Sequence, residues 1–343
     1  MRKLLNTLFV TTPDTYMALD GENVVVYREE EILLRVPLHT LESILYFGYK
    51  GASPALMGAC AERSVRLAFV TPNGRFLAAA AGKVRGNVLL RAQQVRASDD
   101  PAARVRFARN FVFGKVYNAR WTLERAVRDH AMRLDVEEIK KVSKRLAAAL
   151  PEILACMGDG QLRGLEGAAA EQYFSVFDQM ILQNKDSFYF HGRSRRPPLD
   201  NVNALLSFVY TLLANDCAAA LEAVGLDPYI GFLHREKPGR TSLALDLMEE
   251  LRCVMGDRLV LTLINKRVVN EKGFTRQESG AVRMDDATRK ALLSAWQNRK
   301  QETIKHPFLQ EKIPWGLVPY VQALLLARCL RGDLDEYPPF LWK

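Results

Sequence analysis

The residues best suited to chemistry in this chain are two glutamates and a histidine, all of types that bind metal ions. Glu166 lies in Gly-Leu-Glu-Gly (164–167), and His234 and Glu249 lie fifteen positions apart in the segment 231–252. Two carboxylates and an imidazole suit a hard divalent ion such as Mg²⁺ or Mn²⁺ better than zinc, which favours more nitrogen and sulfur ligands. Spacing alone does not assign an ion to these three residues.

Arginines and lysines surround these residues in the sequence. Acidic ligands in a basic environment indicate a metal that works on a phosphodiester. The basic loop 193–196 follows Tyr189 and Phe190, which are aromatic side chains on which bases can stack; the alternative is a solvated basic loop. The residues that we expect to bind DNA are Arg163, Arg193, Arg195, Arg196, Arg235, Lys237 and Arg240.

The same segments resemble the CRISPR adaptation integrase family, the first CRISPR-associated protein, and most of all its type I-C form. The resemblance rests on Gly-Leu-Glu-Gly (164–167), on Arg-Ser-Arg-Arg-Pro-Pro-Leu-Asp-Asn-Val-Asn-Ala-Leu-Leu-Ser-Phe-Val-Tyr (193–210) and on the stretch 231–252. A less sharp match lies at Ser-Ile-Leu-Tyr-Phe-Gly (43–48). By the order and separation of the three long motifs, the whole chain is identified as a member of the family.

The resemblance implies that Glu166, His234 and Glu249 are both the metal ligands and the catalytic residues, with Mg²⁺ or Mn²⁺ as cofactor. Many relatives carry aspartate at the third position, so Glu249 departs from the pattern and has a longer reach. Asp246 lies three residues before it on the same expected helix face and would orient a water or a ligand, although pairing with Arg240 is an alternative. Outside this motif, a glutamate such as Glu166 near a helix start would merely complement the helix dipole.

The activity implied by the resemblance is metal-assisted phosphoryl transfer on DNA. Attack by water would cleave the DNA, whereas attack by a DNA 3′-hydroxyl would insert a short foreign fragment into the CRISPR array. We therefore expect a divalent-metal-dependent endonuclease and integrase that binds duplex, forked or branched DNA. One alternative is a non-catalytic DNA-binding scaffold with a structural ion. Another is a nuclease of RNA processing or DNA repair.

Composition agrees with an anionic partner. The chain has 343 residues, a net charge of +9 and a pI near 9.3, and its length suggests about two domains. The five cysteines are scattered and odd in number, which predicts no disulfide framework and no zinc site and favours a reducing compartment. Without a signal h-region or an apolar run of roughly 20 residues, we expect a soluble cytoplasmic protein that does not contact membranes.

The pattern of the chain changes at residue 86. Before it, short β-branched runs and turn signals such as Asp20-Gly21 predict strands, with a short helix capped by Ser53 before Pro54. We expect an α+β protein, with a small N-terminal β-strand dimerisation domain at 1–86 and a larger all-helical catalytic domain at 87–343. The predicted strands are 4–10, 16–19, 24–27, 32–36, 41–47, 66–70 and 75–79, with a hairpin turn at 71–74.

Apolar residues recur at helical spacing from residue 87 to about residue 330. Breaks are expected at 99–101 and 158–160, and a turn at Pro238-Gly239. One helix should carry Glu166 near its start and run to about residue 182, and another should run from Asp200 to Val224.

Protein partners follow from edge strands and from the resemblance. Unpaired edge strands seek partners, and the resemblance implies a homodimer, two of which bridge a dimer of the small second CRISPR-associated protein. The tail 333–343 is rich in aromatic residues and prolines. It would either dock on that partner or cover its own helical domain.

Overall fold

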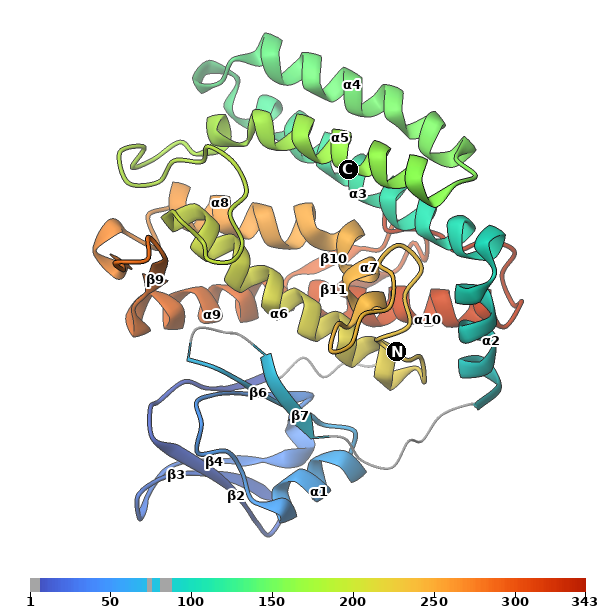
Figure 1. Ribbon diagram of the computed structural model, residues 1–343. Helices are drawn as coiled ribbons and strands as arrows, with labels where there is room; N and C mark the ends of the chain where they lie inside the picture. The colour runs from blue at the N-terminus through green and yellow to red at the C-terminus, as the bar shows by residue number, and fades with distance from the viewer. Residues whose placement is uncertain (1–6, 73–75, 81–87) are drawn as a thin grey trace. The chain divides into compact units, whose positions relative to one another are not determined.

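The computed structural model describes residues 7–72, 76–80 and 88–343. The chain forms two compact units, shown in Figure 1. The N-terminal unit consists of Met1–Arg85, Asp286–Glu302 and Trp315–Leu317, and the helical unit consists of Gly86–Asp285, Thr303–Pro314 and Val318–Lys343. The expected strand positions 4–6 and 75, the turn positions 73–74 and the change of pattern at 86 lie outside the described residues.

The N-terminal unit is built on two sheets, and the expected α+β class is confirmed. In the first sheet, β1, β5 and β6 run parallel and β7 is antiparallel to β6; the second sheet is the antiparallel meander β2-β3-β4. The strands are β1 (Thr7–Val10), β2 (Thr15–Asp20), β3 (Asn23–Arg28), β4 (Glu31–Pro37), β5 (Ser43–Phe47), β6 (Arg66–Val70) and β7 (Phe76–Ala80).

Two local signals in this unit are confirmed at the residues that carry them. Asp20 pairs with Asn23 across the β2–β3 hairpin, and Gly21 adopts a φ of +57°, a left-handed conformation that glycine tolerates. Helix α1 (Pro54–Glu62) crosses from β5 to β6, and the backbone N–H of Leu56 donates to Ser53 Oγ at 3.2 Å.

Helix α9 (Asp286–Gln301) belongs to the N-terminal unit although it follows the helical region in sequence. The guanidinium of Arg299 lies 4.6 Å from the centre of the Trp315 ring, and the Trp315 backbone N–H donates to Glu302 O. Periodicity alone does not reveal this placement, because an amphipathic helix does not specify which apolar surface it covers.

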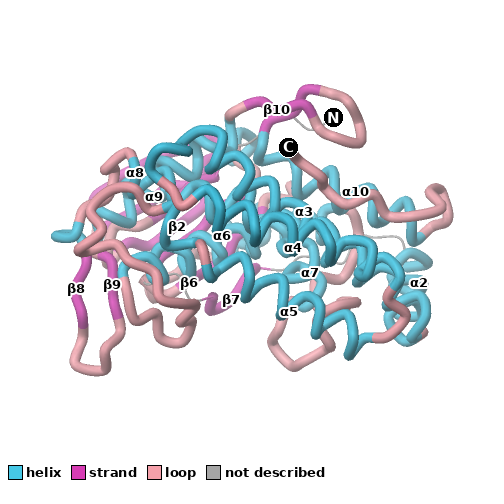
Figure 2. Tube along the Cα trace, turned by 90° about the horizontal axis from the view of Figure 1, so that it is seen from above, coloured by secondary structure: helices cyan, strands magenta, loops and turns pink. Residues whose placement is uncertain are grey.

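The helical unit is mostly helical, as expected, but it also contains two small hairpins that the sequence analysis did not anticipate. Three long helices, α3, α4 and α5, pack side by side (Figure 2). The helices are α2 (Val88–Asp99), α3 (Pro101–His130), α4 (Val136–Ala155), α5 (Asp159–Ser175), α6 (Asn201–Ala223), α7 (Ser242–Leu251), the π-helical turn η4 (Arg252–Asp257), α8 (Arg258–Asn265) and α10 (Val318–Leu330). The hairpins pair β8 (Phe274–Arg276) with β9 (Val282–Met284) and β10 (Thr303–Lys305) with β11 (Lys312–Pro314).

Aspartate side chains cap helix starts in this unit, and one predicted helix differs from the structure. Asp100 caps α3 by accepting from Ala102 N at 3.0 Å, and Asp200 caps α6 by accepting from Asn203 N at 2.7 Å. The expectation for α5 was wrong at both ends, because Glu166 lies mid-helix rather than near the start and the helix stops at Ser175. The helix-dipole explanation of Glu166 therefore does not apply, since the dipole acts within the first turn.

Helix α6 has the length and apolar composition of a membrane-crossing segment. However, 67% of its most apolar stretch is buried inside the structure. Its apolar side chains, including Val202, Leu206 and Leu213 at 0% exposure, are those of a core helix.

The C-terminal tail covers its own helical unit, which is one of the two roles expected for it. Tyr337 and Phe340 are buried, and both donate to the buried carboxylate of Glu250 on α7, Tyr337 through its hydroxyl and Phe340 through its backbone N–H. Asn118 Nδ2 donates to Glu250 O and to Phe340 O, both at 2.7 Å. Burial raises the pKa of Glu250 to about 7 despite these hydrogen bonds.

The tail and α7 meet α3 at Gly114. A Cβ at this position would lie 2.9 Å from Glu250 Cβ and 3.2 Å from Pro339 Cβ, so only glycine permits this approach. The position of α3 against α7 is therefore fixed one residue before Lys115.

We expect Phe340→Ala to lower the free energy of unfolding by about 3–5 kcal/mol, because it leaves a cavity under the tail. The matched control is Phe308→Ala, since Phe308 is 48% exposed in the same unit and surface substitutions usually change stability by about 0.5 kcal/mol or less. Denaturant unfolding of both variants measures the difference. Equal effects from the two variants would contradict the docked tail.

We expect stability to fall between pH 6.5 and 4 because of His306. Burial lowers the pKa of His306 to about 4, although its hydrogen bond to Gln322 opposes the shift. The unfolded chain therefore takes up this proton first as the pH falls, and the stabilisation present above pH 6.5 is lost on the way to pH 4. Denaturant unfolding across this range should give a shallower pH dependence for His306→Gln than for the wild type, by roughly 3 kcal/mol at most. Parallel curves would contradict a buried neutral imidazole.

Candidate metal centre

Three elements of the helical unit bring the two expected carboxylate ligands onto one ammonium group. Glu166 comes from α5, Glu249 from α7 and Lys115 from α3. The Lys115 ammonium pairs with Glu166 Oε1 and lies 2.8 Å from Glu249 Oε2. A single cationic nitrogen therefore occupies the space between the two carboxylates.

Glu249 lies between two cations. Its Oε1 accepts from Arg252 Nη2 at 2.5 Å, while its Oε2 faces Lys115 and makes no hydrogen bond of good geometry. Burial alone would raise the pKa of this carboxyl, but Arg252 and Lys115, with a smaller contribution from His234, outweigh burial and lower it to about 2. Glu249 is therefore a buried carboxylate that stays ionised through the neutral range.

His234 is held by Asp246, which lies one helical turn before Glu249 on α7. Asp246 Oδ1 accepts from the His234 backbone N–H at 2.9 Å and from Nδ1 at 2.6 Å, and Oδ2 accepts from Phe232 N and Leu233 N. In the tautomer in which Nδ1 donates to the carboxylate, the lone pair of the imidazole is on Nε2. Asp246 is thus a positioning residue, and Arg240 instead contacts Arg235 O and Ser242 Oγ.

The loop that carries His234 depends on Gly231. A Cβ there would lie 2.7 Å from His234 O, 2.9 Å from Asp246 Oδ2 and 2.9 Å from Ser242 C. Glycine therefore lets the loop fold back tightly on the first turn of α7.

The three expected ligands do not form a ready-made metal cluster, because no group of three His, Cys, Asp or Glu side chains within the described ranges is close enough to hold an ion. Their chemistry nevertheless fits a hard divalent ion. Two carboxylate oxygens already face one cation, and one of them, Glu249 Oε2, is buried and makes no hydrogen bond of good geometry. The Asp246–His234 pair has the arrangement of a carboxylate that orients a metal-binding imidazole.

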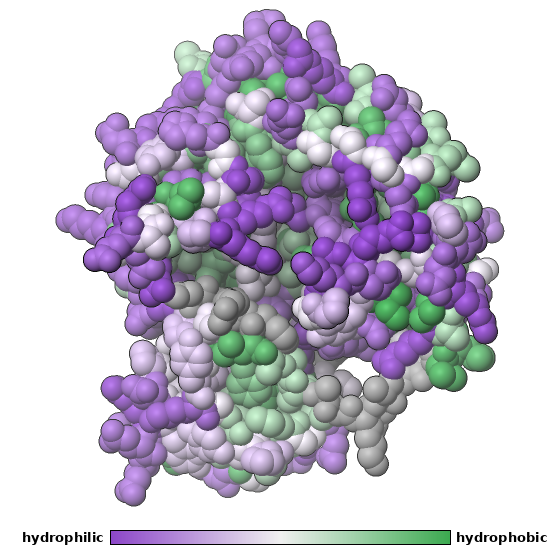
Figure 3. Space-filling model, viewed as in Figure 1, coloured by the Kyte–Doolittle hydropathy of each residue, from purple (hydrophilic) through white to green (hydrophobic). Residues whose placement is uncertain are grey.

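The seven basic residues expected at DNA lie in three different settings. Arg195, Arg196 and Lys237 are exposed, and hydrophilic side chains cover much of the face of the helical unit seen in Figure 3. Two exposed arginines support the site itself: Arg163 donates to Leu233 O at 3.0 Å, and Arg235 pairs with Asp159 at 2.7 Å. Arg193 and Arg240 are partly buried.

Arg193 of the basic loop and Arg252 of the candidate metal centre both contact the ring of Tyr210. Their guanidinium carbons lie 5.1 Å and 5.0 Å from the centre of the Tyr210 ring, and the Tyr210 hydroxyl donates to the buried Asp257. Arg193 also donates to Asn203 Oδ1.

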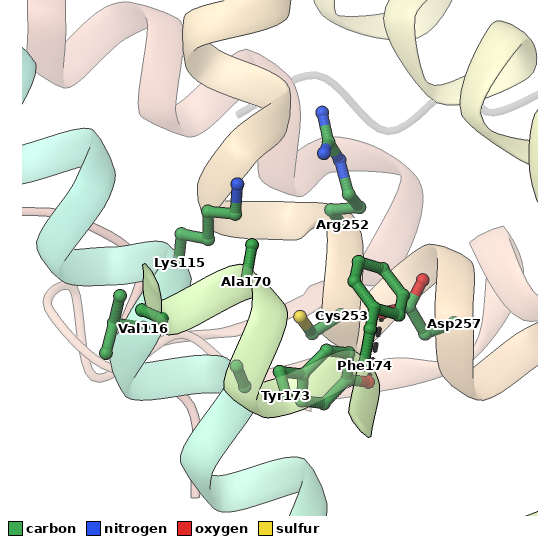
Figure 4. Close-up of a pocket in the computed structure, with 10 residues that line it drawn as sticks. Lys115, Val116, Ala170, Tyr173, Phe174, Arg252, Cys253 and Asp257 are labelled. Atoms are coloured by element: carbon green, nitrogen blue, oxygen red, sulfur yellow. Dashed lines mark hydrogen bonds between the residues drawn. The ribbon is translucent and has the colours of Figure 1, made fainter. Parts of the chain in front are cut away.

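A small cavity of about 10 Å³ lies between α3, α5 and η4, which is room for about one water. Lys115 and Arg252 lie on one side of it, and Tyr173, Phe174 and Asp257 on the other (Figure 4). The cavity is therefore too small to hold a substrate.

Sequence reasoning missed Lys115 and Arg252. A signal for Lys115 exists, because it lies four residues after Phe111 and four before Ala119, both buried, and therefore occupies the apolar face of α3. A lysine on such a face needs an acidic partner. The sequence does not say which acid that is, because both partners lie more than fifty residues away.

Comparison with known proteins gives consistent matches. The family model described as CRISPR associated protein Cas1 matches residues 8–298. The CRISPR-associated endonuclease Cas1 1 of Chlorobaculum tepidum is 50% identical over 343 residues, which cover 100% of both chains.

Two solved structures share the fold. A casposase bound to integration product has a TM-score of 0.83 at 21% identity, over 98% of this chain and 94% of the other. A chain of a Cas6-RT-Cas1–Cas2 complex has a TM-score of 0.83 at 22% identity, over 100% of this chain and 36% of the other.

We expect Gly231→Ala to destabilise the protein by about 1–3 kcal/mol, because the added methyl group has to push apart the His234 loop and α7. Gly160→Ala on α5 is the matched control, since a Cβ there meets nothing within 4 Å and alanine stabilises a helix by up to about 1 kcal/mol. Thermal unfolding of both variants gives the comparison. A Gly231→Ala protein as stable as the wild type would contradict the tight loop.

Proposed function

The chain belongs to the Cas1 family of CRISPR-associated proteins, and we propose that it is a divalent-metal-dependent DNA endonuclease and integrase of CRISPR adaptation. The observation that carries the proposal is the convergence of Glu166 and Glu249 on one cation, next to a histidine that Asp246 orients. We further assign the chain to the type I-C form, on the three sequence motifs at 164–167, 193–210 and 231–252.

Glu166, Glu249 and His234 Nε2 would hold Mg²⁺ or Mn²⁺. When bound, the ion would polarise a phosphate oxygen and favour the deprotonated form of the attacking hydroxyl or water. Asp246 keeps the lone pair of His234 on Nε2, and Arg252 holds the carboxylate of Glu249 through its Oε1.

The proposed reaction exchanges one phosphodiester for another. The oxygen of a DNA 3′-hydroxyl forms a new bond to phosphorus, the bond from phosphorus to the 3′-oxygen of the target strand breaks, and that oxygen leaves with a proton. Water in place of the hydroxyl gives cleavage instead. Both reactions need a phosphate close to Glu166, and Gly164 and Gly167 leave open space on either side of it, since a Cβ at either glycine meets nothing within 4 Å.

DNA binding would rest on the exposed basic side chains of the helical unit. Arg195, Arg196 and Lys237 are exposed to solvent. Arg235 and Arg163 instead stabilise the loop around His234, through Asp159 and Leu233 O. Contacts of this kind bind phosphates and carry little sequence information, so we propose salt-dependent binding to duplex, forked or branched DNA.

We propose that the chain forms a homodimer and assembles with Cas2 in the cytoplasm. Strand β4 lies at the edge of its sheet and exposes Ile32, Leu33 and Leu34 at 49%, 40% and 41%, which is a surface suited to pairing with a second copy. The Cas2 partner is suggested by the shared fold with a chain of a Cas1–Cas2 complex.

The alternative in a different class is a DNA-binding scaffold with a structural ion and no chemistry. The solvent access of Glu166, whose side chain is 27% exposed, favours the enzyme. A purely structural ion is normally enclosed by its ligands.

We expect Glu166→Gln to abolish strand transfer while DNA binding is retained. The assay joins a short duplex with 3′-hydroxyl ends to a supercoiled plasmid with a leader and repeat, in the presence of Mn²⁺ and Cas2. The amount of joined product should fall by roughly a hundredfold or more. Changing a residue that only supports a metal ligand already lowers activity by up to about a hundredfold, and Glu166 is itself an expected ligand. EDTA should abolish the product of the wild type.

The matched control for this assay is Glu171→Gln, an exposed glutamate on the same helix, which should behave as the wild type. Equal product from Glu166→Gln and the wild type would contradict the site. Absence of product from the wild type, with DNA binding intact, would favour the scaffold. Faster cleavage of RNA than of branched DNA would point to an RNA-processing nuclease.

A further inference from the structure

Lys115 is the feature of the site that neither the sequence motifs nor the proposed reaction explain. Its side chain is 9% exposed, although lysine is among the residues least often buried. It lies on α3, which contributes no expected ligand, and its ammonium contacts the carboxylates of Glu166 and Glu249.

The charges around this ammonium balance without a metal ion. Glu166 and Glu249 contribute two negative charges, and Lys115 and Arg252 contribute two positive charges, all four in direct contact as ion pairs. A divalent ion added to these four groups would give them a net charge of +2 in a partly buried site, where screening by water is weak. The Asp246 carboxylate beside His234 offsets only one of these charges. A cation must therefore leave, or an anion must arrive, when the ion binds.

Of the two cations, Lys115 is the one that is placed to leave. Arg252 is held by the Tyr210 ring as well as by Glu249 Oε1, whereas Lys115 contacts the very oxygens that would bind the ion. The backbone of α3 stays fixed, because Gly114 packs against Glu250 and Pro339. The flexible side chain of Lys115 can rotate away without moving the helix. Its partner Glu166 is partly exposed, so the ammonium can reach solvent on that side.

We propose that Lys115 is a built-in counter-cation of the metal site: its ammonium holds Glu166 and Glu249 together before the divalent ion binds, and is displaced by that ion. This inference rests on the proposed metal site. Lys115 then lowers the affinity for the free ion. It also couples ion binding to DNA binding, because the phosphate of the substrate neutralises the charge that the ion brings.

The test is a Mn²⁺ titration followed by electron paramagnetic resonance of the free ion. Lys115→Met keeps the length of the side chain and removes its charge, and we expect it to bind Mn²⁺ about tenfold or more tightly than the wild type. Lys115→Arg should bind more weakly, because its permanently charged fork can hold both carboxylates. The matched control is Lys140→Met, since Lys140 pairs with Glu124 away from the site; its affinity should equal that of the wild type.

Thermal unfolding gives a second readout that does not depend on activity. In EDTA, Lys115→Met should melt below the wild type because its two carboxylates repel each other, and saturating Mn²⁺ should raise its melting temperature by more than it raises that of the wild type. A short duplex should tighten Mn²⁺ binding more in the wild type than in Lys115→Met, because only the wild type has a displaced ammonium to compensate.

The outcomes distinguish this inference from the proposed function. If Glu166→Gln leaves Mn²⁺ binding unchanged, the metal site is wrong and the role of Lys115 falls with it. If Glu166→Gln weakens binding but Lys115→Met binds Mn²⁺ no more tightly than the wild type, the metal site stands and the counter-cation is overturned. If Lys115→Met does not fold, Lys115→Arg decides: weaker binding supports the inference, and unchanged or tighter binding overturns it.

Discussion

The helical unit is organised around the electrostatic requirement of two carboxylates that face one point in a partly buried site. Glu249 is 3% exposed, and an unpaired charge at that depth would be strongly unfavourable. Lys115 on α3 pairs with both carboxylates, and Arg252 in the turn after α7 pairs with Glu249. Because Glu166 comes from α5, three separate parts of the chain meet at this point. Because the two carboxylates need a positive charge between them, the same position suits a divalent ion.

The remaining contacts keep α7 and the His234 loop fixed against α3. Gly114 lets α3 and α7 approach, and the C-terminal tail closes over Glu250, the residue next to Glu249, with two hydrogen bonds to its carboxylate. One turn earlier on α7, Asp246 accepts hydrogen bonds from three backbone N–H groups and from the His234 ring. A tail far from the expected ligands in sequence thus contributes to their placement.

The sequence was informative where a local rule decides the conformation. Ser53 before Pro54, Asp20-Gly21 and Asp200 before α6 each mark a turn or cap whose hydrogen bond is formed within a few residues. The sequence failed where distant partners decide. The end of α5, the hairpins β8–β9 and β10–β11, and the two partners of Lys115 depend on contacts that no local pattern encodes. The motifs placed Glu166, His234 and Glu249 in the same unit, but they gave no sign of the ammonium between the carboxylates.

The most direct test of the metal site is a crystal structure of the protein soaked with Mn²⁺, with anomalous diffraction measured at the manganese edge. We expect one strong anomalous peak bound by Glu166, Glu249 and His234 Nε2, with the Lys115 ammonium moved away from both carboxylates. A peak elsewhere would contradict the metal site, and a Lys115 ammonium still between Glu166 and Glu249 at full manganese occupancy would contradict its displacement.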